Sequence, residues 1–142
     1  MKEPSEARKR TLALQARAIT FSTNVNRSYP TAMNYPSEIV WNQLVRAADG
    51  TSNNLVEADN GSTDPDFLNK LRTALREAKE SKACLAKIRL VPLANAQRVL
   101  ELGLEQEADE LAAIYSTIIT NMEIRLSKER DEKKRKRRRR ED

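Results

Sequence analysis

The chain of 142 residues contains no histidine and a single cysteine, Cys84. Histidine is the commonest general base near neutral pH and a frequent metal ligand, and one thiolate cannot complete a cysteine-based metal site. A lone cysteine also excludes an intramolecular disulfide. No glycine-rich phosphate-binding motif is present either. We therefore expect a protein that is not an enzyme, with no catalytic residues, no metal and no cofactor.

Glycine, proline and aromatic residues are also scarce. There are 3 Gly and 5 Pro, aromatic residues make up 4% of the chain, and charged residues make up 33%. A sheet-rich fold needs more turn-forming and β-branched residues, so this composition favours long helices in an all-α protein of one domain. No apolar run is long enough to span a bilayer, and no apolar leader opens the chain. We expect a cytoplasmic protein with no membrane partner.

Apolar residues spaced three and four apart predict four helices. Local signals mark their ends: Asn60 and Gly61 tolerate a helix C-terminus, Thr63 or Asp64 can cap a new helix, and Pro92 disfavours further helix. Short connections favour an antiparallel up-down-up-down four-helix bundle. The predicted helices cover about 5–27, 36–58, 64–90 and from 95 onward, in a bundle of residues 1–127 followed by a basic tail, 128–142.

The predicted fourth helix contains Gly103, which costs about 1 kcal/mol relative to alanine inside a helix. We expect a long packed helix to absorb this cost and to continue into the basic tail until charge repulsion frays it. Four pairs of opposite charge, spaced four residues apart, favour that extension. These pairs are Arg125 with Glu129, Glu129 with Lys133, Asp131 with Arg135, and Glu132 with Lys136.

A polar stripe on the second predicted helix is a candidate helix contact or subunit interface. Its members recur at helical spacing: Arg46, Gly50, Asn53 and Glu57, with Asn54 at the edge. Because glycine costs helix stability, its place here suggests that another backbone approaches closely, with Arg46 and Glu57 paired across the contact. The alternative is an ordinary solvated face. Beside it, a second stripe either completes the core or faces another chain: Trp41, Val45, Ala48 and Ser52.

The C-terminal tail carries the net charge of the chain. Residues 128–142 include ten basic and five acidic side chains, a difference equal to the +5 of the whole chain. An unbroken basic block predicts binding to RNA or DNA phosphates without sequence readout, because no aromatic residue interleaves it. Alternatives are solvation or assembly, and targeting or an acidic membrane surface. The predicted nucleic-acid-binding residues are Lys133, Lys134, Arg135, Lys136, Arg137, Arg138, Arg139 and Arg140.

Residues 46–80 resemble a family of bacterial four-helix bundle proteins encoded in intervening sequences of large-subunit ribosomal RNA genes. Relatives of that family are the accessory variability proteins of diversity-generating retroelements. The matching residues are Arg46-Ala47-Ala48, Asn54, Glu57, Phe67-Leu68, Ala74 and Glu80. This resemblance implies a cyclic homo-oligomer, typically a pentamer with a central channel, and in the retroelement branch an accessory factor for a reverse transcriptase and its template RNA.

Two functions are compatible with these observations. The first is a non-enzymatic oligomeric helical-bundle protein that binds nucleic acid electrostatically. The alternative is a protein–protein interaction scaffold that does not bind nucleic acid and in which the tail is incidental.

Overall fold

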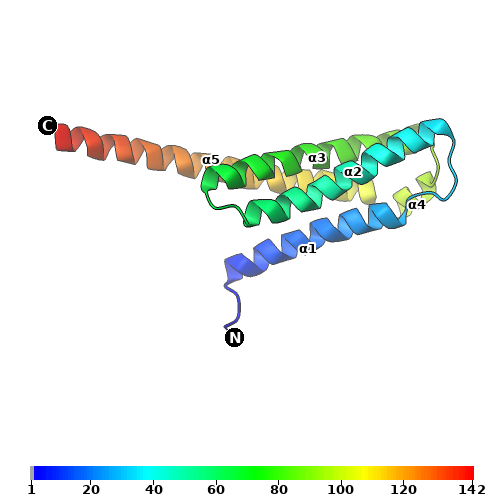
Figure 1. Ribbon diagram of the computed structural model, residues 1–142, viewed down its shortest axis with the longest axis horizontal. Coiled ribbons are helices and arrows are strands. Elements are labelled where there is room, and N and C mark those ends of the chain that lie inside the picture. Colours follow the sequence, from blue (N-terminus) through cyan, green and yellow to red (C-terminus); the bar gives the residue numbers. More distant parts are fainter. Residues whose placement is uncertain (1) are drawn as a thin grey trace.

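The computed structural model describes residues 2–142, and every regular element in that part of the chain is a helix. The four long helices pack as an antiparallel bundle, with the short α4 at the turn between α3 and α5 (Figure 1). The predicted all-α four-helix bundle is thereby confirmed. The helices are α1 (Glu6–Arg27), α2 (Tyr35–Asp59), α3 (Asp64–Leu90), α4 (Ala96–Glu101) and α5 (Leu104–Glu141).

Side-chain caps define the start of the first three helices. The side-chain oxygens of Ser5, Asn34 and Thr63 accept hydrogen bonds from backbone N–H groups three residues later, at 3.1, 3.1 and 3.2 Å. Such caps satisfy donors that have no partner inside the helix. Pro36 and Pro65 occupy first-turn positions where a missing N–H costs nothing. Local chemistry therefore sets these boundaries.

The predicted continuous fourth helix is wrong, because Gly103 divides it. Gly103 has a left-handed backbone (φ 62°), as does Asn95 (φ 58°), so α4 ends at Glu101 and α5 begins at Leu104. Glycine adopts this conformation at little cost, whereas within a helix it would be unfavourable. With the break, Val99 and Leu104 are both buried, at 3% and 2% exposure. The chain thus converts a weak helix position into a turn.

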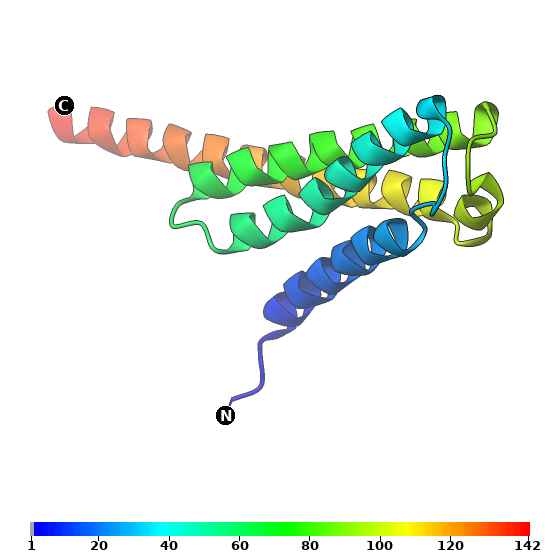
Figure 2. The same ribbon diagram turned by 45° about the vertical axis from the view of Figure 1, so that its right-hand side comes forward.

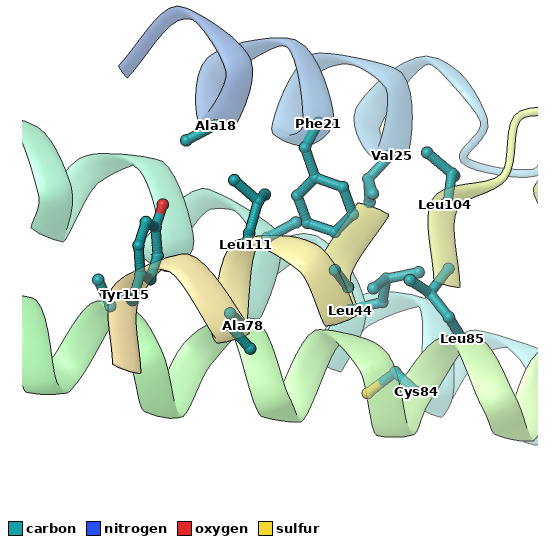
Figure 3. Close-up of a cluster of buried hydrophobic side chains, with 14 of the residues drawn as sticks. Ala18, Phe21, Val25, Leu44, Ala78, Cys84, Leu85, Leu104, Leu111 and Tyr115 are labelled. Atoms are coloured by element: carbon teal, nitrogen blue, oxygen red, sulfur yellow. The ribbon is translucent and has the colours of Figure 1, made fainter. Parts of the chain in front are cut away.

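All four long helices contribute to a continuous apolar core (Figure 3). Phe21, Leu44 and Leu111 are almost fully buried there. Its polar groups have partners: the Tyr115 hydroxyl donates to the carbonyl oxygen of Thr51 at 3.0 Å, and the Trp41 indole Nε1–H donates to that of Ala94 at 2.9 Å. Burial raises the pKa of the Tyr115 hydroxyl.

The stripe that contains Trp41 is therefore mostly core. Trp41, Ala48 and Ser52 are buried within the single chain, and Val45 is partly buried. This outcome favours core completion over contact with a second chain.

The first half of α1 is the least buried part of the bundle. Helix α1 lies at an angle to the others (Figure 2), and its buried residues all come from its second half. Leu12 and Ile19 are 41% and 49% exposed. An ion pair of 2.6 Å between Arg8 and Asp59 nevertheless holds the start of α1 against the end of α2. The side of α1 that carries Leu12, Ala16 and Ile19, which recur at helical spacing, is thus left uncovered.

Candidate nucleic-acid interface

Helix α5 continues well beyond the bundle. Its last buried residue is Ile119, Leu126 still packs against the core, and every residue from Ser127 onward is exposed. At about 1.5 Å per residue, the segment Ser127–Glu141 projects roughly 22 Å. Figure 1 shows this projection past the other helices. The predicted helical extension is present, and the helix runs to Glu141.

The projecting helix concentrates positive charge. Lys133 to Arg140 form eight exposed cations, and within residues 2–142 none of them lies within ion-pair distance of a carboxylate. On a helix they occupy about 12 Å, or roughly one charge per 1.5 Å. Double-stranded DNA carries about one negative charge per 1.7 Å. The two charge densities therefore match closely.

The oppositely charged pairs expected in this segment are largely absent. Of the four, only Arg125 and Glu129 approach each other within 4 Å, at 3.8 Å between Nε and Oε1. The block also contains four pairs of like charges at the i,i+4 spacing, each unfavourable by about 0.2–0.5 kcal/mol. The helix therefore repels itself. A bound polyanion would relieve this repulsion and stabilise the helical form.

Gly50 lies against α3, but the expected close backbone is not there. A Cβ atom at position 50 would lie 2.8 Å from Cγ and 3.3 Å from Cβ of Glu77, so its close neighbour is a side chain. Burial, followed by the nearby Glu80 carboxylate, raises the pKa of Glu77. Gly50 thus leaves room for a carboxylate that is itself partly desolvated.

Arg46 and Glu57 do not pair with each other within the chain. Glu57 lies on the α3 side, where it pairs with Lys70 at 2.8 Å, and Arg46 is exposed without an ion-pair partner in the described chain. Arg46 instead lines an open surface groove of about 820 Å³ between α1 and α2. Gly50, Asn53 and Asn54 also line it.

One member of the polar stripe makes a hydrogen bond within α2. Asn54 donates from Nδ2 to the carbonyl oxygen of Gly50 at 2.9 Å. In the same groove, Asp49 accepts hydrogen bonds from Ser22 at 2.6 Å and Asn26 at 2.9 Å, which links α2 to α1. Asp49 was not predictable from the sequence, because its partners lie more than twenty residues away and leave no local signal.

Cys84 and the acidic residues do not form a reactive-thiol or metal site in the described part of the chain. Cys84 is buried, and burial raises the pKa of its thiol, which disfavours the reactive thiolate. No group of three or more His, Cys, Asp or Glu residues in the described part of the chain is placed to hold a metal ion. Among residues 2–142, no helix is long and apolar enough to cross a membrane.

Fold and surface together define a small helical-bundle protein with a projecting basic helix. The bundle is similar to the crystal structure of a protein of unknown function from the S23 ribosomal protein family of Bacteroides thetaiotaomicron, with a TM-score of 0.63 and 24% sequence identity. The match covers 75% of this chain and 97% of that one. No protein-family model and no curated protein matches the chain. The structural match establishes a shared fold, that of a family also described as 23S rRNA intervening-sequence proteins.

Proposed function

We propose that this protein is a non-enzymatic, oligomeric helical-bundle protein that binds RNA or DNA through the basic extension of α5. The observation that carries the proposal is the block of eight exposed, unpaired cations, Lys133 to Arg140, on a helix that leaves the bundle. Its charge density is close to that of a nucleic-acid backbone. Solvation of the protein does not require eight consecutive residues with the same charge.

The binding acts on phosphates rather than on bases. The segment 128–142 contains no aromatic residue to stack on bases. Its cations point to all sides of the helix, because successive residues turn by about 100°. Affinity should therefore depend strongly on salt and little on sequence.

Self-assembly would make these weak contacts avid, since each subunit of an oligomer contributes one basic helix. The uncovered stripe of α1, with Leu12 and Ile19, supplies an apolar surface for a second copy. The sequence resemblance extends this proposal to a ring, typically a pentamer. It also suggests a reverse transcriptase with its template RNA as the cytoplasmic partner.

A protein–protein scaffold is the second candidate, and one observation favours it. Several large apolar side chains are exposed at the end of the bundle opposite the basic helix. These are Tyr35 (74%), Leu90 (70%), Val91 (61%) and Leu100 (61%). Such an exposed group is typical of a surface that contacts another protein.

Native mass and bound nucleic acid of the purified protein distinguish the two candidates. The measurement is made before and after nuclease treatment, on the full chain and on a variant that lacks 133–142. Nucleic-acid binding predicts that the full chain carries nuclease-sensitive material, and that the shortened chain keeps its oligomer mass but carries none. A full chain free of nucleic acid would favour the scaffold, and a monomer at micromolar concentration would contradict the assembly.

A further inference from the structure

A surface groove lies where α5 leaves the bundle, beside the first turns of α3. It encloses about 620 Å³. Leu68, which is 5% exposed, and the partly buried Leu126 contribute apolar surface. The groove is also lined by Asn69, Arg72, Glu123, Ser127, Glu129, Arg130 and Lys133. Polar donors and cations thus surround apolar contacts at the base of the basic helix.

The charges in this groove are unbalanced in favour of cations. Glu123 is paired with Arg72 at 3.4 Å, and Glu129 is paired with Arg125 at 3.8 Å. Within the described residues, Arg130 and Lys133 have no carboxylate within ion-pair distance. The lining therefore holds three cations and two carboxylates, Arg130 and Lys133 are free to meet an anion, and the guanidinium of Arg72 has further N–H donors beyond its contact with Glu123.

The groove is continuous with one face of the projecting helix. Leu126, Arg130, Lys133 and Arg137 are spaced four, three and four residues apart, which places them on one side of α5. The side of α5 that packs on α3 in the bundle therefore becomes basic beyond it. A chain of phosphates that follows this face reaches the bundle at Arg72.

We propose that this groove binds a phosphate of the nucleic-acid backbone, held by Arg72, Arg130 and Lys133. The inference rests on the proposed nucleic-acid function and adds a fixed point of contact on the folded domain. A guanidinium can donate two parallel hydrogen bonds to phosphate oxygens. The neighbouring apolar side chains exclude some water and strengthen the attraction. The backbone is thereby placed along one side of α5 rather than at random around it.

Two matched double variants test the groove while all eight cations of the basic block remain. The test variant is Arg72→Gln with Arg130→Gln. The control is Lys82→Gln with Lys128→Gln: Lys82 is likewise an exposed, ion-paired residue of α3, and Lys128 lies about 160° around α5 from Arg130. Both variants lose the same charge. Fluorescence anisotropy with a labelled 20-nucleotide single-stranded RNA, at several salt concentrations, reports the binding.

If the groove holds one phosphate, the test variant should bind severalfold more weakly, with a log–log salt slope shallower by up to about 0.7 units, the contribution of one lost phosphate contact on a single strand. The control should change by less than half of that. Equal changes in both variants would overturn the groove while the basic helix remains the binding element. If the full chain does not bind the RNA, or binding is unchanged without 133–142, the proposed function falls and the groove with it.

Discussion

The contact between Gly50 and Glu77 gives a quantitative test of how α2 packs on α3. Replacing glycine by alanine inside a helix normally stabilises a protein by about 1 kcal/mol. Here the new Cβ would lie 2.8 Å from Cγ of Glu77, well inside van der Waals contact. The Glu77 side chain must leave its rotamer, at a cost of about 0.5–1.5 kcal/mol. We therefore expect Gly50→Ala to change the free energy of unfolding by less than about 0.5 kcal/mol.

The second variant, Glu77→Ala, removes the obstacle. Only the Cβ of residue 77 remains near position 50, at 3.3 Å, which a small shift accommodates. In that background Gly50→Ala should stabilise the protein by close to the full helix-propensity gain of about 1 kcal/mol. The coupling energy between the two positions is then about 1 kcal/mol, which a double-mutant cycle resolves.

Urea unfolding followed by circular dichroism, at one fixed protein concentration, measures all four members of the cycle. Gly50→Leu serves as an extreme case and should destabilise the wild-type background, because its bulk has no space beside Glu77. Equal stabilisation of both backgrounds by Gly50→Ala would show that Glu77 does not restrict position 50. A higher melting temperature for Gly50→Leu with the assembly intact would likewise show that this face is merely solvated.

Three further predictions concern the core and one ion pair. Leu71→Asp should unfold the domain, because Leu71 is fully buried and an unpaired charge there costs several kcal/mol; undiminished helicity and melting by circular dichroism would contradict this. Tyr115→Phe should lower the free energy of unfolding by about 1 kcal/mol through loss of its hydrogen bond to Thr51, and urea curves that coincide would show that the bond contributes nothing. The hydrogen bond from Arg8 lowers the pKa of Asp59, so its contribution is present above the unfolded pKa and is lost as pH falls through the folded one. Asp59→Asn should therefore destabilise by less than about 1 kcal/mol at neutral pH, and its difference from wild type should vanish in acid; a difference that is constant with pH would exclude the ion pair as its cause.

Features encoded by neighbouring residues were predictable from the sequence. The cap at Thr63 and the proline at position 65 act within one helical turn, and α3 begins where they indicate. The apolar spacing likewise predicted the long helices, and apolar residues within them, such as Leu71, are buried. Spacing alone could not show what covers a stripe, so Trp41 became assignable to the core only when its contacts across the bundle were known.

Features that depend on distant residues were missed. Gly103 weakens a continuous helix locally, but the apolar spacing continues past it, and the burial of Val99 and Leu104 against the other helices, which also favours the break, leaves no local signal. The groove brings together Arg72 and Arg130, which lie 58 positions apart in the sequence. Nothing local to either residue indicates the other. The basic helix itself was predictable because its charge and length are written in one continuous segment.

The salt dependence of nucleic-acid binding tests the central claim most directly. Binding constants are measured for the full chain and for a variant lacking 133–142, across a range of salt concentrations. If all eight cations meet phosphates, the log–log slope of the full chain is steeper by up to about six units on single strands and about seven on duplex DNA. Both proteins should show the same helical bundle by circular dichroism. Equal slopes would remove the basic helix from the binding site, and no binding by the full chain would contradict the proposed function.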